Sequence, residues 1–179
     1  YELQCRLCDA AGIRKKGWDH VTYGSISSSA AVAKLMNFSA KKVRDALAIA
    51  MTTGNYLRQT RIGEISEWKA AAFAHAGQNA LRAVQYVRQG LDGPSEIFTG
   101  KHGLINQITL GEFDLAGRFG GQDGEPFKIL STYIKYFPAE YHSQSAIWAA
   151  LALREIIGKA HVRDIAKIHV ETSFHSYDI

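Results

Sequence analysis

The sequence predicts a mainly α protein, with an all-helical large domain over residues 1–117 and the start of a smaller α+β domain over residues 118–179. Two patterns support this division. Apolar residues recur at helical spacing through most of the first part, whereas the stretch behind the glycine-rich segment GRFGGQDGEP changes to alternation. A 46% share of hydrophobic residues among 179 is enough for one good core.

Composition excludes several classes of function. The 21 Lys and Arg residues outnumber the 17 Asp and Glu only slightly and form no stripe with aromatic residues, so we expect no nucleic-acid partner. No hydrophobic run reaches membrane-spanning length, so we expect no membrane partner either.

Two cysteines cannot cross-link a secreted domain of this size, which indicates a reducing compartment: the cytoplasm or, in a eukaryote, the mitochondrial matrix. Because the chain begins at Tyr1 and not at Met, we expect it to be a segment of a longer protein.

The first helix is predicted over residues 1–13, with Leu3 and Leu7 on its packed face. Cys5 and Cys8 are then small residues buried on or near this helix. A Cys-x-x-Cys pair also suits redox or metal chemistry, but there is no second pair and no strand and turn before it. We therefore expect no metal site.

A loop bracketed by Gly17 and Gly24 leads into a predicted helix over residues 25–36, and backbone N–H groups at a helix start favour anions. His20 stands in this loop beside Asp19. An adjacent carboxylate favours the protonated imidazole, which suits a general acid or an anion-binding cation. The alternative, a structural histidine beside an exposed Asp19, fits the local sequence equally well.

Ser39 is the expected N-cap of a scaffold helix. Behind that helix, Arg58 and Arg61 stand in a short segment just before the next one. Arginine side chains bind carboxylates in a bidentate way, so the two would form a polyanion site if both point inward. The alternative is that both are exposed.

The longest predicted helix runs from Ser66, its expected N-cap, to a stop at Gly90. Lys69 is at the start of a narrow apolar face to which another helix can come close. A lysine in a close-packed seam needs an anion or loses its charge; the alternative is that Lys69 lies on the flank and reaches water. The residues of this face are Ala72, Phe73, Ala76, Ala80, Leu81, Ala83, Val84 and Val87.

Behind residue 118 the pattern predicts a strand over residues 126–138, an amphipathic helix over residues 143–157 and a second strand over residues 164–174. Strand, helix and strand in this order are typical of a β-α-β unit. The sequence therefore predicts a second, mixed domain in this part of the chain.

His142 is placed where the first of these strands runs into the helix, and Ser143 and Gln144 follow as polar first-turn residues. In α/β units this is the usual place for ligand contacts. The other histidines lack comparable settings and are interpreted as surface or structural residues: His75, His102, His161, His169 and His175.

Four segments are informative together: GWDHVTYGSISSSAAVAKLM, LRQTRIGEISEWKAAAFAHAGQNALRA, GLDGPSEIFTGKHG and FPAEYHSQSAIWAA. In this order they resemble the MmgE/PrpD superfamily, which includes 2-methylcitrate dehydratase and cis-aconitate decarboxylase. The last segment is especially similar to the dehydratases. The resemblance runs along nearly the whole chain, although the chain would cover less than half of such a protein.

The resemblance implies a helical large domain, a smaller α+β lid domain, and an active site in the cleft between them. It also implies an enzyme without metal or other cofactor, acting as a homodimer. The family's active-site positions that match are His20, Lys69 and His142. Other such positions, an Asp and a His before this segment and a Tyr after it, have no counterpart here, so this segment alone would be catalytically incomplete.

The implied reaction is the dehydration of 2-methylcitrate to 2-methyl-cis-aconitate in propionate catabolism. It needs a base for the proton next to a carboxylate, an acid for the leaving hydroxyl, and cations for the carboxylates of a small tricarboxylate. We expect His142 as acid or base, His20 as its partner or a carboxylate ligand, and Lys69 as carboxylate clamp. The residues expected to bind the substrate are Asp19, Arg58, Arg61, Ser143 and Gln144.

Two other reactions of the superfamily stay open, the decarboxylation of cis-aconitate and the epimerisation of iminodisuccinate. All three begin with a carbanion-like centre beside a carboxylate, so the shared residues do not distinguish them. A function of another class also stays open. In it the chain is a non-catalytic binding or assembly module whose alanine-rich helix serves subunit packing.

Overall fold

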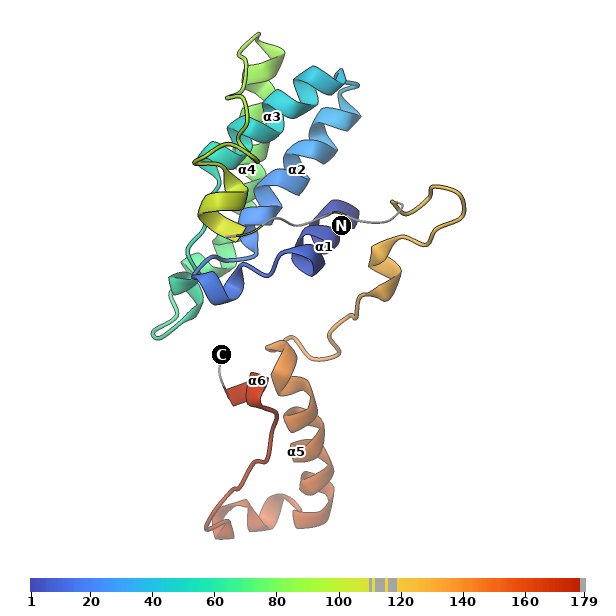
Figure 1. Cartoon of the computed structure of the whole chain (residues 1–179). Helices are drawn as coiled ribbons and strands as arrows, with labels where there is room; N and C mark the ends of the chain where they lie inside the picture. Colours follow the sequence, from blue (N-terminus) through green and yellow to red (C-terminus); the bar gives the residue numbers. More distant parts are fainter. Residues whose placement is uncertain (110, 112–114, 116–118, 178–179) are drawn as a thin grey trace. The chain divides into compact units, whose positions relative to one another are not determined.

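The computed structural model of the chain is built from helices and connecting segments (Figure 1). It describes residues 1–109, 111, 115 and 119–177. The chain divides into two compact units, Tyr1–Ser131 and Thr132–Ile179. The prediction of a mainly α protein is confirmed, whereas the domain boundary near residue 118 stays a prediction.

The first unit is a group of packed helices, and Figure 1 shows α2, α3 and α4 side by side. Short 3-10 helices precede α2 and α4. The main helices of this unit are α1 (Glu2–Ala10), α2 (Val21–Leu35), α3 (Ala40–Thr53) and α4 (Trp68–Arg88), and the 3-10 helices are Arg14–Lys16 and Arg58–Arg61.

The alanine face predicted for α4 is buried, which confirms the helical pattern on which it was based. Phe73 and Leu81 were wrongly assigned to this face, since they are 42% and 49% exposed. Phe73 instead borders α2, where a Cβ on Gly24 would come within 2.9 Å of its ring. The buried residues of α4 are Ala72, Ala76, Asn79, Ala80, Ala83, Val84 and Val87.

The ends of α4 are only partly as predicted. The helix begins at Trp68 with Glu67 as its N-cap, so the assignment of Ser66 was wrong. The backbone carbonyl of Ser66 still accepts from the N–H of Lys69, at 3.2 Å. At the other end the stop at Gly90 is confirmed, because this residue has a φ of 100°, which only glycine adopts without strain.

Helix α2 begins at Val21, four residues before the predicted start. The reason is a side chain: Oδ1 of Asp19 accepts a hydrogen bond from the N–H of Val21 at 3.0 Å and so satisfies one of the free donors of the first turn. Gly24, interpreted from the sequence as a loop residue, lies inside the helix.

Helix α1 packs through Leu7 into a cluster with residues of α2, α3 and the π-helix Ile105–Thr109. The prediction that both cysteines are buried was wrong, since Cys8 is exposed and Cys5 is partly exposed. The buried members of the cluster are Leu7, Ala11, Ile13, Tyr23, Ile26, Met51, Leu104 and Ile108.

Glu2 on α1 binds backbone both within the glycine-rich stretch and just after it. Its carboxylate accepts from the backbone N–H groups of Gly120 and Lys128, at 2.8 and 2.7 Å, and from Nε of Arg6 at 2.7 Å. These bonds, those from Gly120 and Lys128 first, lower the pKa of Glu2 to about 2. Gly120 and Lys128 are therefore held against α1 by their backbone N–H groups.

The second unit contains α5 (Gln144–Ile157), which confirms the predicted helix, and the short α6 (Phe174–Tyr177). The two predicted strands were wrong. The described residues of the two segments include 3-10 turns and form no β-ladder. In that part of the chain, neither segment has a neighbouring strand with which its backbone groups could form hydrogen bonds. Ile134, 98% exposed, and Ile168, 75% exposed, have no second sheet layer to cover them.

Within the described part of the chain, no helix is both long enough and apolar enough to cross a membrane.

The connection after α4 passes close to α3 at one glycine. Ser39 caps α3 as predicted, by accepting from the N–H of Lys42 at 3.5 Å. Asp45, on the same helix, is buried and only 2% exposed. A Cβ on Gly93 would lie 2.4 Å from the backbone oxygen of Asp45. This separation is far below van der Waals contact, so the backbone of one segment would have to move.

We expect Gly93→Ala to lower the free energy of unfolding of the full-length protein by about 1–3 kcal/mol, as overpacking does. Gly77→Ala is the matched control, because a Cβ on Gly77 meets nothing within 4 Å and alanine favours the interior of α4 by roughly 0.5–1 kcal/mol. Denaturant unfolding of both variants checks this. Equal stability of the two would contradict the close approach.

Candidate active site

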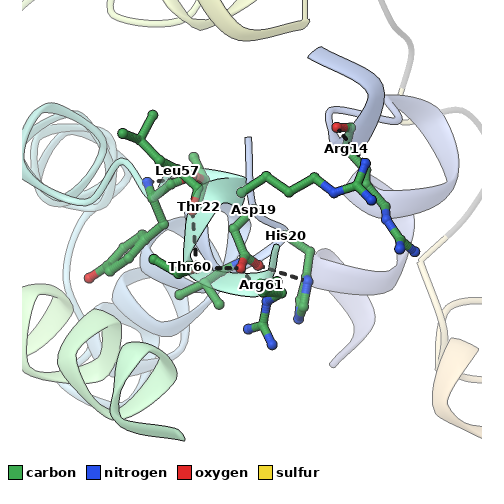
Figure 2. Close-up of polar contacts among 10 residues, drawn as sticks. Arg14, Asp19, His20, Thr22, Leu57, Thr60 and Arg61 are labelled. Atoms are coloured by element: carbon green, nitrogen blue, oxygen red, sulfur yellow. Dashed lines mark hydrogen bonds and ion pairs between the residues drawn. The ribbon is translucent and has the colours of Figure 1, made fainter. Parts of the chain in front are cut away.

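Asp19 is the centre of a polar network that joins two segments far apart in the sequence (Figure 2). Its carboxylate is buried, with the side chain only 1% exposed. Oδ1 accepts from the N–H of Val21 at 3.0 Å and lies 2.9 Å from Nδ1 of His20. Oδ2 accepts from Nε of Arg61 and from the hydroxyl of Thr60 at 3.4 Å. All the partners are donors, as an ionised carboxylate requires.

A short backbone pairing brings the two segments together. Trp18 and Leu57 form an isolated antiparallel bridge. Beside it, the N–H of Asp19 donates to the carbonyl of Tyr56 at 2.8 Å, and the N–H of Tyr56 donates to the hydroxyl of Thr22 at 3.0 Å. The loop before α2 and the loop before α4 are therefore held in one register, which sets Arg61 next to Asp19.

This environment determines the charge of Asp19. Burial alone would raise the pKa of its carboxyl group, but the hydrogen bonds from His20, from the N–H of Val21 and from Arg61 hold that pKa well below its usual range. Asp19 is therefore ionised at neutral pH and can only accept hydrogen bonds.

The tautomer of His20 follows from the charge of its neighbour. Because the Asp19 carboxylate is an acceptor, Nδ1 of His20 holds a hydrogen, and Nε2 is left for another partner. The side chain of His20 is 56% exposed, and its Nε2 bonds to no other residue that the structure describes. A histidine oriented by a carboxylate, with one nitrogen open to solvent, can exchange a proton with a ligand or donate to a carboxylate.

The two arginines of the predicted polyanion site behave differently. Arg61 is bound through Nε, which leaves its Nη groups without a partner among the described residues, and the side chain is 27% exposed. Such a half-buried guanidinium can still bind an incoming carboxylate. Arg58 donates instead to the carbonyl of Arg14 at 3.5 Å, and it is partly exposed. Only Arg61 joins the Asp19 network.

Lys69 is in the first turn of α4, and His20 directly precedes α2; the starts of these two helices pack together. Val21, the residue after His20, packs in one buried cluster with Ala72 and Ala76, and Ala72 is one turn after Lys69. The lysine is partly buried and makes no ion pair with any described residue. Its ammonium group is therefore available to an anion.

His142 belongs to the second unit, in the 3-10 turn Tyr141–Ser143 directly before α5. Its N–H donates to the carboxylate of Glu140. Gln144 closes the turn, since its side-chain amide bonds both the N–H and the carbonyl of Phe137, at 2.9 and 3.1 Å. The amide of Gln144 is thus already engaged with the backbone.

His142 also lines an open cleft of about 660 Å³ within this unit. Glu171, in the segment that was predicted as a strand, supplies a carboxylate to the same cleft. The predicted site residues thus fall into two groups, one in each unit, and Ser143 is in neither the Asp19 network nor the cleft lining. The cleft is lined by Tyr141, His142, Gln144, Ser145, Glu171, Thr172, Ser173 and Ser176.

No group of three His, Cys, Asp or Glu side chains in the described ranges is arranged to hold a metal ion.

A family model, the MmgE/PrpD N-terminal domain, matches residues 1–116, well over half of the chain. This chain belongs to the MmgE/PrpD family. The match ends close to the glycine-rich segment and includes His20, Asp19, Arg61 and Lys69. It therefore confirms the resemblance that the four sequence segments indicated.

Relatives of this MmgE/PrpD chain are named as dehydratases. The chain is 30% identical to the mitochondrial 2-methylcitrate dehydratase of Yarrowia lipolytica over 185 residues, 96% of this chain and 33% of that protein. It is 27% identical to the 2-methylcitrate dehydratase of Cupriavidus necator, over 96% of this chain and 36% of that protein. It is 29% identical to the alkylcitrate dehydratase phiI of a fungal species, over 97% and 34%. The chain spans about a third of the length of these relatives.

Sequence reasoning missed several residues that shape the site in this family member. Thr60 contacts Asp19 across 41 residues of sequence, and Tyr56 contacts Thr22, in the first turn of α2, across 34. Glu171 reaches the cleft only through the turn of the chain after α5. A polar residue between two helices carries no local signal of such a partner, so none of the three could be found from spacing.

The ionised state of Asp19 predicts a specific dependence of stability on pH. Its folded pKa lies below the unfolded value of about 3.9, so the stabilisation is present above that value and is lost as pH falls through the folded pKa. We expect Asp19→Asn to lower the stability of the full-length protein at neutral pH and to flatten its decline between about pH 5 and pH 2. Denaturant unfolding across this pH range measures both effects.

Asp92→Asn is the control, because its carboxylate is 79% exposed and pairs with Lys41 at the surface. We expect this variant to retain the pH profile of the unsubstituted protein. If Asp19→Asn did the same, the hydrogen bonds to Asp19 would contribute nothing to stability.

Proposed function

We propose that this chain is part of a cofactor-independent hydro-lyase that dehydrates 2-methylcitrate to 2-methyl-cis-aconitate. The observation that carries the proposal is the Asp19–His20 pair, with the free Nη groups of Arg61 beside it. The names of the relatives support the substrate class. Because the chain spans about a third of their length, the activity is proposed for the whole protein.

Dehydration of a tricarboxylate begins with the removal of a proton next to a carboxylate. The carbanion-like charge that develops spreads onto that carboxylate, so cations held in place lower the barrier. We assign this task to Lys69 and to the Nη groups of Arg61. Neither has an anionic partner among the described residues, since Arg61 bonds to Asp19 through Nε. Arg58, which is partly exposed, is assigned to attracting the substrate.

Proton transfer is assigned to the two histidines. Nε2 of His20 points away from the Asp19 bond and can exchange a proton with the substrate or bind its carboxylate. His142 is the proposed acid or base from the second unit, where its cleft offers room for a ligand. Ser143 and Gln144 keep the proposed role of shaping the substrate site, Gln144 by holding the turn that presents His142.

Asp19 receives a different role from the one predicted for it. The sequence suggested a substrate ligand, yet its carboxylate is buried and accepts from protein donors at both oxygens. A second carboxylate brought against it would also be repelled. We propose that Asp19 acts through His20 and Arg61, as a positioning residue.

The proposed assembly is a homodimer. The proposed location is the cytoplasm or, in a eukaryote, the mitochondrial matrix, and the Yarrowia relative is named as a mitochondrial protein. The acid, the base and the carboxylate ligands named above are all side chains, so the proposed chemistry calls for no cofactor.

The test is product analysis with the full-length protein. We expect 2-methylcitrate to give a conjugated alkene, seen as a rise in ultraviolet absorbance without added metal and identified by NMR. Parallel reactions with cis-aconitate and iminodisuccinate distinguish decarboxylation and epimerisation. An intact protein that turns over none of these and shows no thermal shift with a tricarboxylate would favour a binding or assembly role instead.

Lys69→Ala is expected to lower kcat/KM for 2-methylcitrate about 100-fold or more, which is about 2.7 kcal/mol of transition-state stabilisation. The reason is the loss of a cation for a substrate carboxylate. Steady-state kinetics of the full-length protein measure it. Arg82→Ala removes an exposed cation from the same helix and is expected to leave kcat/KM within about twofold. Unchanged kinetics of Lys69→Ala would remove Lys69 from the site.

A further inference from the structure

Tyr56 has a second set of contacts that the proposed chemistry does not use. Its ring is 7% exposed, and its hydroxyl oxygen lies 2.9 Å from Nδ1 of His75 and 3.2 Å from Nδ2 of Asn79. Both partners are on α4, the helix of Lys69. His75, interpreted from the sequence as a surface or structural residue, is therefore bonded to the loop before its own helix.

The direction of one of these bonds can be assigned. Nδ2 of Asn79 also reaches the carbonyl of Thr53 at 3.5 Å, and a carbonyl only accepts, so the amide presents its NH₂ group on this side. Asn79 therefore donates to the oxygen of Tyr56, and the same hydroxyl shares a hydrogen bond with Nδ1 of His75. Tyr56, His75 and Asn79 thus form one hydrogen-bonded array.

The array extends to the first turn of α4. The ring of Trp68 lies against that of His75, with centroids 5.3 Å apart and planes tilted by 57°. On its other side His75 meets the Tyr56 ring edge-on, at 6.0 Å and 77°. Trp68 directly precedes Lys69 in the chain. Three rings in sequence therefore connect the loop residue Tyr56 with the turn that contains Lys69.

The backbone of Tyr56 also bonds to the segment of Asp19 and to the first turn of α2. Its carbonyl accepts from the N–H of Asp19, and its N–H donates to the hydroxyl of Thr22. One residue therefore joins the segment of Asp19 and His20, through its backbone, to the helix of Lys69, through its side chain.

We propose that Tyr56 and His75 are positioning residues, whose hydrogen bond sets the rotation of α4 and so aims Lys69 at the anion bound by Arg61 and His20. This inference rests on the proposed function, since it assumes that Lys69 binds a substrate carboxylate. Neither residue contacts the substrate. Each side chain of an α-helix points outward at a fixed angle about the helix axis. A rotation of α4 about that axis therefore moves the ammonium group of Lys69 away from the anion.

The hydroxyl and the ring of Tyr56 have separable tasks. The ring packs with Val21, Ala72 and Ala76, and phenylalanine preserves that packing. Apolar contacts among small residues carry little directional information, because alanines allow α4 to slide or turn against α2. The hydrogen bond to His75 is directional and fixes one of these arrangements. Loss of the hydroxyl is therefore expected to affect substrate binding more than folding.

The test uses four variants of the full-length protein: Tyr56→Phe, His75→Leu, His75→Asn and the double variant Tyr56→Phe/His75→Leu. We expect Tyr56→Phe and His75→Leu each to lower kcat/KM for 2-methylcitrate about tenfold, and the double variant to be no worse than either. His75→Asn should recover most of the loss, because the side-chain amide of asparagine can bond to the Tyr56 hydroxyl in place of Nδ1.

Kinetics are measured well below the unfolding temperature of every variant, so that lost stability does not enter. Tyr86→Phe, an exposed tyrosine on the same helix, is the control and should match the unsubstituted protein. Normal kcat/KM values in both single variants, effects that add in the double variant, or a His75→Asn variant as impaired as His75→Leu would overturn the inference alone. A protein that neither turns over nor binds 2-methylcitrate before any substitution would overturn the proposed function and this inference with it.

Discussion

The first unit depends on one buried charge, the carboxylate of Asp19. An ionised carboxylate in a protein interior is costly unless donors surround it, and here the donors come from the start of α2 and from the segment before α4. Satisfying that charge therefore requires the two segments to meet. The same bonds begin α2 at Val21 and orient His20, so one electrostatic requirement organises both the fold and the candidate site.

Local patterns predicted the helices well, because their cause is local. The alanine face of α4 follows from a 3.6-residue period, and the cap at Ser39 from one side chain and the next turn. The site was predictable only as a set of residue types. That Asp19 binds Arg61, 42 residues away, depends on the bridge between Trp18 and Leu57, which no periodicity shows.

The failure of the predicted strands has a physical cause as well. Alternation of apolar residues indicates only that a segment suits a pleated, half-buried surface. A strand also needs a neighbour to take its backbone hydrogen bonds, and the described residues after 118 supply none. Helix α5 satisfies its own backbone, so it forms where the flanking segments do not. The turn at His142 survives because it depends on the helix start and on Gln144.

A carboxylate at the centre of the proposed anion site looks unfavourable, yet the burial of Asp19 and its hydrogen bonds make the two compatible. The charge of Asp19 is buried and hydrogen-bonded by donors on both oxygens, so little of it is open to a ligand. The groups that do face outward are Nε2 of His20, the Nη atoms of Arg61 and the ammonium of Lys69, and the two basic side chains exceed the one carboxylate in charge. A polycarboxylate bound at the proposed site would meet the Nη groups of Arg61 and the ammonium group of Lys69, while the buried Asp19 holds Arg61 and His20 in place. Rigid donors cost little reorganisation when charge develops on the substrate, which is what proton removal beside a carboxylate requires.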